Sequence, residues 1–484
     1  MVDYLIIGAG YAGLSAAALL AKNKFSTLLL ESHSKIGGCA SHYKRKDFTF
    51  DVGATTFSGI KPNQPLGRLF KELSIEPKLK KVDPGLIAKI DGKEIIRYAD
   101  KLKWTEAASE YFNSSKQINF WQKIFEIDDL AWEFLSHNNS IPPNSLLDYI
   151  KLSKPSNLRY AKLLAGILSS LKTEINKFDL SNSLFKRFLE EQLLITTQNS
   201  VDQAPLLTSA MGLSYPSETY YPYGGMYKPA ELILNSFKSN GGEIKFKRKV
   251  TSIKKHKDYY KVETANGEIF DSKGIISSIP IWNMAELTDS EIQKYYQNYA
   301  KYFDFAWGAF TINFAIETKA ELNSLYYQIH TYDQIPNCDS RSYFVSFSAK
   351  DDYAKAPDGW RTVTISCHTK TEKWLNLTKE EYSRRKSFTA QYILKSLFNN
   401  LPQLEGSQIE WELAGSPKTF QHYTQRKNGF VGGIPHSIEK NLLKMPPNQT
   451  PFKNFYQIGD TAFPGQGTPG VVLGALSCVE RILK

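Results

Sequence analysis

The chain has 484 residues, of which 42% are hydrophobic, and its 60 basic and 49 acidic residues give a formal net charge of +11. This composition excludes a disordered protein, and the length suffices for two or three domains' worth of core. No apolar run approaches the roughly 20 residues that cross a bilayer. No charged leader with a cleavage site precedes the first strand, so a cytoplasmic location is expected.

The excess of basic residues suits either nucleic acid or an anionic membrane surface. No nucleic-acid-binding motif is visible, so we expect no nucleic-acid partner and favour the membrane, with a lysine-rich soluble surface as the alternative. The cysteines form no CxxC and no close pair in the sequence, and the eight histidines form no HExxH, which predicts reduced thiols and no metal. The cysteines are Cys39, Cys338, Cys367 and Cys478.

The first predicted elements are a strand, a glycine turn and a helix that can hold a dinucleotide. Apolar Leu5–Ile7 predict a buried parallel strand, and an alanine-rich helix follows the turn. Gly8 permits the tight turn, Gly10 lets the backbone approach a pyrophosphate, and Gly13 lets the helix pack on the sheet. Glu31 closes the next strand, where a ribose hydroxyl would be held. The motif predicts a site for an ADP moiety, with a chance glycine turn as the alternative, and leaves FAD and NAD open.

Two further glycine segments come soon after Glu31. In the first segment, a pair of glycines lets the backbone run close to a ligand. In the second, a strand of alternating aromatic residues ends in an acid and a glycine, where the backbone can again pass close to a ligand. Taken singly, each is equally consistent with an ordinary turn or strand end. The candidate residues are Gly37 and Gly38 in the first segment and Asp51, Gly53 and Ala54 in the second.

Residues 100–205 are rich in predicted helices, and one stretch has the pattern of a membrane-surface helix. Between Lys151 and Lys172 there are five basic residues and no acid. A cationic flank beside an apolar face suits an anionic bilayer, although such a face more often packs on the protein's own core. The apolar side chains at helical spacing are Tyr160, Leu163, Leu164, Ile167, Leu168 and Leu171, within an expected helix over 158–171.

The middle of the chain mixes helices and strands. Helices are expected over 228–239 and 380–398, and a hairpin is expected at Asn266-Gly267. The expected strands lie at 243–253, 274–280, 310–316 and 362–367.

The C-terminal segment repeats the order of strand, glycine loop and helix. The strand from Phe455 ends in Gly459-Asp460, and Asp460 is placed to accept a hydrogen bond from a sugar-alcohol hydroxyl. The helix over 471–483 would aim its positive N-terminus at a cofactor ring that becomes anionic on reduction, as a flavin does. A surface loop capped by a helix is the alternative. The loop and helix residues expected at the ring are Gly467, Thr468, Pro469, Gly470 and Val471.

These elements predict an α/β protein whose Rossmann-type nucleotide-binding domain is discontinuous, with a second α+β substrate domain that contains a helical, membrane-facing part. The nucleotide-binding domain is expected to comprise residues 1–85, 224–285 and 445–484. Residues 86–223 would form the helical part, and residues 286–444 would form the sheet and helices of the substrate domain.

With these motifs the sequence resembles the phytoene desaturase and carotenoid isomerase family, within the amine-oxidase-like flavoproteins. The stretch Asp51–Arg68 is most similar to desaturases that act near the end of the polyene. Further matching stretches begin at Ser416-Pro417 and Phe463-Pro464, and 100–205 matches weakly. The resemblance implies non-covalent FAD, with the backbone near Val250 at the adenine. It also implies a carotenoid or other long polyene substrate, and oxygen or a quinone as electron acceptor.

The implied reaction is desaturation, in which a hydride passes from a saturated carbon to flavin N5 and a proton leaves the neighbouring carbon. Alternatives are a carotenoid cis-trans isomerase or a retinoid saturase of the same family, an amine or protoporphyrinogen oxidase, and a non-catalytic flavin- and lipid-binding carrier. No catalytic acid or base is identified, and His42, His422 and His436 are expected to be structural. The expected location is cytoplasmic, peripherally on the inner face of a membrane.

Overall fold

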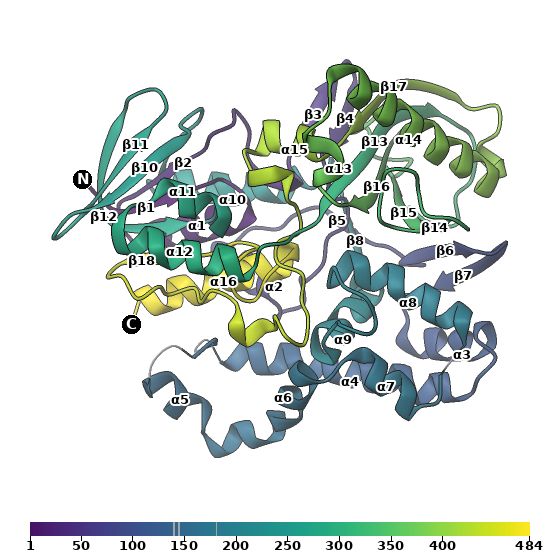
Figure 1. Ribbon diagram of the computed structural model, residues 1–484, viewed down its shortest axis with the longest axis horizontal. Coiled ribbons are helices and arrows are strands. Elements are labelled where there is room, and N and C mark those ends of the chain that lie inside the picture. Colours follow the sequence, from purple (N-terminus) through teal and green to yellow (C-terminus); the bar gives the residue numbers. More distant parts are fainter. Residues whose placement is uncertain (139–140, 144–145, 181) are drawn as a thin grey trace.

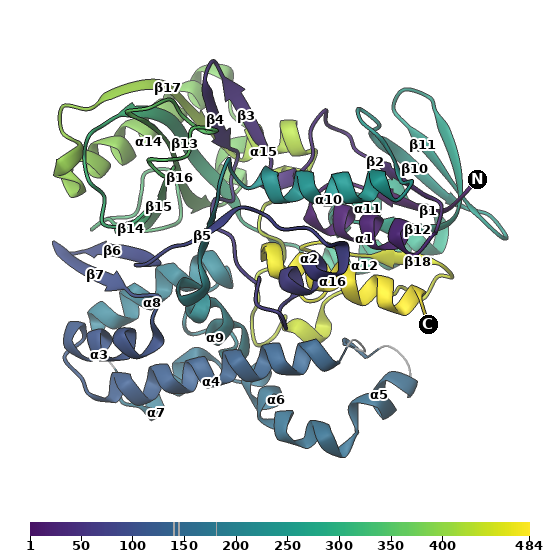
Figure 2. The ribbon, with the colours of Figure 1, turned by 180° about the vertical axis from the view of Figure 1, so that it is seen from behind.

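The computed structural model describes residues 1–138, 141–143, 146–180 and 182–484, which form two seven-stranded β-sheets, two short two-stranded sheets and a helical part (Figure 1). Both termini lie at the first sheet, while the helical part covers the lower side of the molecule in this view. The same parts are seen from behind in Figure 2.

The first sheet is built from three separate stretches of the chain. β1 pairs in parallel with β2 and β12, and β12 pairs in parallel with β18, so their carboxyl ends lie at one edge. The expected strand over 243–253 is wrong, because β9 and β10 are separate strands that pair with different partners. The order is β10 (Val250–Lys255), β11 (Tyr260–Thr264), β12 (Ile269–Ser277), β1 (Val2–Ile7), β2 (Thr27–Leu30) and β9 (Glu243–Lys245), with β18 (Phe455–Gln457) on the end of β12.

Helices pack on the first sheet through small and aliphatic side chains. α1 (Tyr11–Lys22) is buried along almost its whole length, because its alanines allow close contact with the strands and neighbouring helices. Beyond the expected boundary at residue 286, Tyr296 of α12 donates a hydrogen bond to Gln457 of β18 over 3.0 Å, so α12 contacts the first sheet. The other helices here are α2 (Pro65–Leu73), α10 (Tyr227–Ser239), α11 (Ile281–Leu287), α12 (Ser290–Tyr302) and α16 (Gly467–Ile482).

The second sheet has one apolar and one polar face. Ile329, Tyr343 and Ile365 point to a core shared with α14 (Lys379–Asn400), and polar side chains alternate with them. Residues 86–97, expected in the helical part, form two strands of this sheet instead, because β6 pairs with β14. The order is β17 (Gln408–Gly415), β13 (Gly308–Glu317), β16 (Trp360–Thr369), β15 (Ser342–Phe347), β14 (Tyr326–His330), β6 (Leu86–Ile90) and β7 (Lys93–Arg97).

The helical part is anchored to the second sheet by Arg97 of β7. Its guanidinium lies 4.3 Å from the ring centre of Trp104 and donates to the carbonyl of Leu213 over 2.9 Å. A cation held over aromatic faces and hydrogen-bonded is stable when buried. The helices are α3 (Lys101–Tyr111), α4 (Lys116–His137), α5 (Leu146–Leu152), α6 (Ala161–Leu168), α7 (Leu171–Lys177), α8 (Ser183–Thr196) and α9 (Leu206–Ser214).

The expected single helix over 158–171 is wrong. A 3₁₀ turn over Pro155–Tyr160 precedes α6, and α7 begins only at Leu171. Tyr160, Leu163 and Ile167 are buried, whereas Leu164 is 56% and Leu168 63% exposed, so the apolar residues divide between the core and the surface. Within the described residues, none of the helices combines the length and apolar character needed to cross a bilayer.

Short elements connect these parts. Cys338 and Cys367, far apart in the sequence, bring their Sγ atoms to 3.4 Å and are both free thiols. The remaining strands and helices are β3 (His42–Arg45), β4 (Phe48–Asp51), β5 (Leu79–Lys81), β8 (Tyr220–Pro222), α13 (Glu372–Leu375) and α15 (Pro417–Thr424). Other 3₁₀ turns cover Gly38–Ala40, Tyr215–Glu218, Pro402–Leu404, Lys427–Gly429 and Leu442–Lys444.

Candidate active site

The glycine turn lies where the carboxyl ends of β1, β12 and β18 meet, which is where open α/β sheets bind ligands. A Cβ on Gly13 would lie 1.9 Å from the Gly8 carbonyl oxygen, so only glycine lets α1 approach the turn. Gly10 differs, because a Cβ there would meet no protein atom within 4 Å. The protein therefore leaves open space beside Gly10, as a pyrophosphate at the helix N-terminus requires.

Glu31 lies beside this turn. Its carboxylate accepts hydrogen bonds from Ala9 N over 2.7 Å and His33 N over 2.8 Å. Oε1, which the His33 amide contacts, also accepts from Ser32 Oγ over 3.1 Å, whereas Oε2 accepts from Ala9 N and has a further lone pair that can accept from a ribose hydroxyl. The Arg248 amide donates to the Glu31 carbonyl over 2.8 Å, which brings the start of β10, and with it Val250, to the same end of the site.

Gly37 and Gly38 complete this end. The Gly37 amide donates to the Ala9 carbonyl over 2.8 Å, and a Cβ on Gly38 would lie 3.5 Å from Gly10 Cα. The two glycine segments are thus side by side, with the open space at Gly10 beside them.

Asp460 lies at the end of β18, paired with a residue that the sequence motifs did not mark. Arg426 donates from Nη2 to Asp460 Oδ2 over 2.8 Å, and both side chains are largely buried. Gly459 adopts φ 96°, and a Cβ there would lie 2.9 Å from the Ser278 carbonyl oxygen, so this strand end also requires glycine. No spacing rule singles out Arg426, since 34 residues separate it from Asp460.

Asp51 holds protein segments together. Its carboxylate accepts from Met226 N over 3.0 Å and forms a buried ion pair with Lys355. These contacts tie β4 to α10 and to the loop after β15. A direct contact between Asp51 and the cofactor therefore remains a prediction, whereas Gly53 and Ala54, next along the chain, line the large cavity described below.

A cavity of about 900 Å³ begins beside the loop that precedes α16. Of the predicted cofactor residues, Gly53, Ala54, Gly467, Thr468, Pro469 and Gly470 line it. Since α16 begins at Gly467, four residues earlier than expected, the positive end of its dipole is directed at the cavity. Among the described residues, the other predicted cofactor residues lie outside its lining, so the ADP end and the cavity are separate regions of one site.

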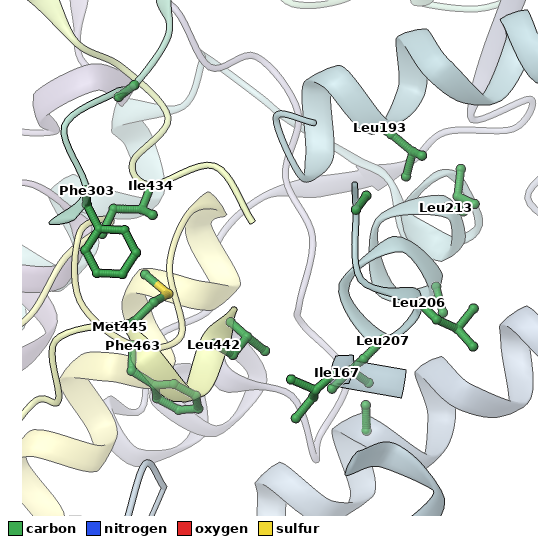
Figure 3. Close-up of a cluster of buried hydrophobic side chains, with 14 of the residues drawn as sticks. Ile167, Leu193, Leu206, Leu207, Leu213, Phe303, Ile434, Leu442, Met445 and Phe463 are labelled. Atoms are coloured by element: carbon green, nitrogen blue, oxygen red, sulfur yellow. The ribbon is translucent and has the colours of Figure 1, made fainter. Parts of the chain in front are cut away.

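Most of the cavity wall is apolar and comes from two distant parts of the chain. Figure 3 shows Leu442 and Phe463, from the segments before α16, across from Ile167 and Leu207 of α6 and α9. Trp132, Leu158 and Leu164 extend this apolar lining to the surface of the helical part. The shape and lining suit a long apolar molecule.

Asp128 of α4 is the buried carboxyl group that the sequence analysis missed. It lines the cavity, is 6% exposed, and its Oδ1 has no hydrogen-bond partner within the described chain. Burial raises the pKa of Asp128 to about 7, although the charges of Lys101 and Lys61 oppose the rise. A carboxyl group of this kind can exchange a proton near neutral pH. In the sequence, the signal that could have identified Asp128 was its position one helical turn from Trp132, on the face of α4 that is buried.

His436, which was expected to be structural, lies beside the loop that precedes α16. It lines the cavity, and neither ring nitrogen has a hydrogen-bond partner among the described residues. Burial lowers the pKa of His436 to about 4, so the imidazole is neutral at pH 7. A Cβ on Gly465 would lie 2.7 Å from His436 Nε2, which places this ring against the loop before α16. His42 stacks on Tyr227, with ring centres 3.6 Å apart, and His422 is exposed.

Residues 11–483 match the family of flavin-containing amine oxidoreductases. The chain belongs to this family. Prolycopene isomerase from Daucus carota is 26% identical over 99% of this chain and 80% of that protein. All-trans-retinol 13,14-reductase from Danio rerio is 23% identical over 100% of this chain and 86% of its own. The 4,4'-diapolycopene oxygenase of a Methylomonas species is 23% identical over 99% of this chain and 97% of its own length.

Solved structures share the fold. An oxidoreductase from Methanosarcina mazei is similar over 99% of this chain and all of its own, with a TM-score of 0.65 at 17% identity. A putrescine oxidase variant is similar over 100% of this chain and 99% of its own, with a TM-score of 0.64 at 14% identity. The expected α/β flavoprotein fold, the resemblance to the carotenoid desaturase and isomerase group, and the enzyme class are confirmed.

FAD is the cofactor, and the residues present fit it. The open space at Gly10 accommodates a pyrophosphate, and the N-terminus of α16 opens on the cavity. The expected residues therefore divide into an ADP end around Gly10 and Glu31 and a ring end around Gly467.

Proposed function

We propose that the protein is an FAD-dependent desaturase of a long, apolar polyene of the carotenoid class. The observation that carries this proposal is the cavity of about 900 Å³, which starts at the cofactor-side residues Gly53 and Gly467 and continues along apolar walls to Leu164. An amine oxidase is the rival assignment within the same family. The relatives that act on prolycopene, retinol and diapolycopene by name support a polyene instead.

In this proposal the chain holds and orients both reactants. FAD, when bound without a covalent link, supplies the acceptor for a hydride taken from a saturated carbon of the polyene, and oxygen or a quinone later removes the electrons. Apolar walls including Leu207 and Phe463 hold the polyene and exclude water. Asp128 lies in the same wall and is suited to take the proton that leaves the neighbouring carbon, because its carboxylate forms near neutral pH.

Cis-trans isomerisation is a second candidate, favoured by the prolycopene isomerases that match this chain over nearly its whole length. The same cavity serves either reaction. An isomerase would convert prolycopene without consuming an oxidant, whereas a desaturase would consume one oxidant for each double bond formed.

The test is anaerobic mixing of the FAD-loaded protein with an acyclic lycopene-type polyene. A desaturase will bleach the oxidised flavin absorption, because two electrons enter the flavin for each double bond. Primary amines, as the control, will leave the absorption unchanged. Bleaching by amines alone would contradict the proposal in favour of an amine oxidase, and tight polyene binding without bleaching or isomerisation would favour a carrier.

We also propose that the protein binds the inner face of a membrane peripherally through α5 and α6, from the cytoplasm. The supporting observation is a set of exposed apolar side chains: Leu146, Leu147, Tyr149, Ile150, Leu158, Leu164 and Leu168. Tyr149, Leu158 and Leu164 also line the cavity, so a polyene could pass from the bilayer to the cavity without crossing water. Two of the nearby cations are paired, Arg159 with Glu133 and Lys162 with Glu126. Apolar burial is therefore the main attraction.

Liposome flotation tests this surface. The double substitution Leu164→Glu/Leu168→Glu will reduce the membrane-bound fraction several-fold, because it places two charges on the exposed apolar face that the membrane would cover. Ile269→Glu is the control, since Ile269 is also 58% exposed but lies on β12 of the first sheet. Equal flotation of the wild type and the double variant would contradict the proposal.

A further inference from the structure

One end of the cavity is polar. It is formed where the polar face of the second sheet meets α8, far from the apolar opening at α6. The polar residues that line the cavity here are Glu191, Gln192, Gln328, Ser340, Ser342, Ser366 and His368. Gln328, Ser342, Ser366 and His368 follow from the two-residue alternation of β14, β15 and β16, whose other side chains fill the core beneath α14. Glu191 and Gln192 come from α8, and Ser340 precedes β15.

A chain of hydrogen bonds orients the amide of Gln328. Ser342 Oγ donates to the Glu191 carboxylate over 2.7 Å, so this hydroxyl accepts its other hydrogen bond. Gln328 Nε2 donates to Ser342 Oγ over 3.2 Å. One N–H of the amide is thereby used and the orientation of the amide is fixed, and Gln328 Oε1 remains a buried acceptor without a partner in the described chain.

Two buried donors lie in the same lining. Gln192 Nε2 and Ser340 Oγ have no hydrogen-bond partner among the residues that the structure describes. Gln192, Gln328 and Ser340 are 4%, 0% and 2% exposed. Buried polar groups are normally hydrogen-bonded, so one acceptor and two donors left unsatisfied in one cavity indicate a ligand group that supplies the missing partners.

This polar end is separated from the cofactor side of the cavity. At the other end of β15, Ser346 Oγ lies 2.5 Å from Oγ1 of Thr55, which follows the cofactor-side residues Gly53 and Ala54. Ser342 and Ser346 are four residues apart on one strand, which corresponds to about 13 Å. Along β15, a group bound at Ser342 therefore lies about 13 Å from the contact with Thr55, which places it toward an end of the substrate.

We propose that Gln192, Gln328 and Ser340 bind a terminal hydroxyl group, so that the substrate is a long polyene alcohol. The proposal rests on the proposed function for the polyene itself. A hydroxyl donates to Gln328 Oε1 and accepts from Gln192 Nε2 or Ser340 Oγ, and so satisfies both kinds of group. An aldehyde only accepts, and a hydrocarbon end leaves every group unpaired.

The test compares three acyclic C30 polyenes that share one chain and end in CH₂OH, CHO or CH₃. Their dissociation constants for the FAD-loaded protein are measured from the shift of the polyene absorption, anaerobically and in the dark. The alcohol will bind at least about tenfold more tightly than the hydrocarbon, with the aldehyde between them, because a buried polar group left unpaired costs about that factor. Gln328→Leu will reduce the preference for the alcohol to about twofold or less without weakening binding of the hydrocarbon.

Thr364→Val is the matched control, because Thr364 lies on the same sheet but outside the cavity lining; it will keep the preference. FAD content and the thermal midpoint verify that each variant is folded, and Ser340→Ala serves if Gln328→Leu is not. Equal affinities of the wild type for the three polyenes would overturn this inference and leave the proposed function standing. Absence of binding by all three would overturn both, as would amine-specific bleaching of the flavin.

Discussion

Replacing Gly10 with alanine will leave the apoprotein folded and weaken FAD binding by about tenfold or more. Gly10 has φ −73° and ψ 177°, which alanine adopts freely, and a Cβ at this position meets no protein atom within 4 Å. The added methyl group instead enters the space that the pyrophosphate needs. Flavin fluorescence during reconstitution of the apoprotein gives the dissociation constant, and the thermal midpoint of the apoprotein gives its stability.

Gly13→Ala is the contrasting control in the same motif. Its Cβ would lie 1.9 Å from the Gly8 carbonyl oxygen, so α1 must move away from the turn and the apoprotein itself loses stability. The two variants thus separate a glycine that the cofactor requires from one that the fold requires. Unchanged FAD affinity in Gly10→Ala would show that the pyrophosphate does not approach this turn.

Replacing Asp128 with asparagine will lower kcat for polyene desaturation by about 100-fold, in the range of general acid–base effects. The pKa of Asp128 is raised by burial to about 7, so the basic form increases as the pH rises through 7. The wild-type rate will therefore fall on the acid side of pH 7, and Asp128→Asn will lose this dependence. The pH profiles of kcat under anaerobic single-turnover conditions provide the measurement.

Asp129→Asn is the matched control, because Asp129 is adjacent but its side chain is 61% exposed and paired with Lys101 on the surface. It will retain the wild-type rate and an acid limb, which will move to lower pH because the Asp129 charge helps to raise the pKa of Asp128. If Asp128→Asn shows wild-type kcat and the same acid limb, Asp128 is not the base.

Asp128 also makes stability depend on pH in a definite direction. The native carboxyl keeps its proton to about pH 7, whereas an unfolded aspartate loses it near 3.9. Between these values the native state binds more protons, so the contribution of Asp128 to stability is complete below about pH 4 and is lost as the pH rises through 7. The thermal midpoint of Asp128→Asn, relative to that of the wild type, will consequently rise between pH 5 and 8. A difference between the two midpoints that stays constant over this range would contradict the raised pKa.

The cofactor site was largely predictable, because its motifs are local. Gly8, Gly10 and Gly13 are defined by backbone requirements within a few residues, and those requirements reappear as the close approaches at Gly8 and Gly13. Gly467–Gly470 were likewise expected at the ring end and line the cavity. Arg426, in contrast, acts through Asp460, and a single arginine in a loop carries no periodic or spacing signal.

The substrate cavity was not predictable at the same level. The apolar stretch 158–171 was expected to present one helical face, but its residues divide between the core and the surface, because a 3₁₀ turn and the start of α7 interrupt the helix. Its excess positive charge is also reduced by Glu126 and Glu133 of α4. Sequence separation hides such pairs, since the partners belong to different elements.

By itself, the sequence determined the fold class, the glycine-rich turns and the family resemblance, because each depends on short-range backbone geometry that a few residues specify. The tertiary structure decided which polar groups lack partners, and therefore what the cavity can bind. Asp128, His436 and Gln328 are ordinary residues in sequence, and only packing removes water from them. Burial and the absence of a partner are properties of the folded chain, because they depend on every segment that packs around a side chain.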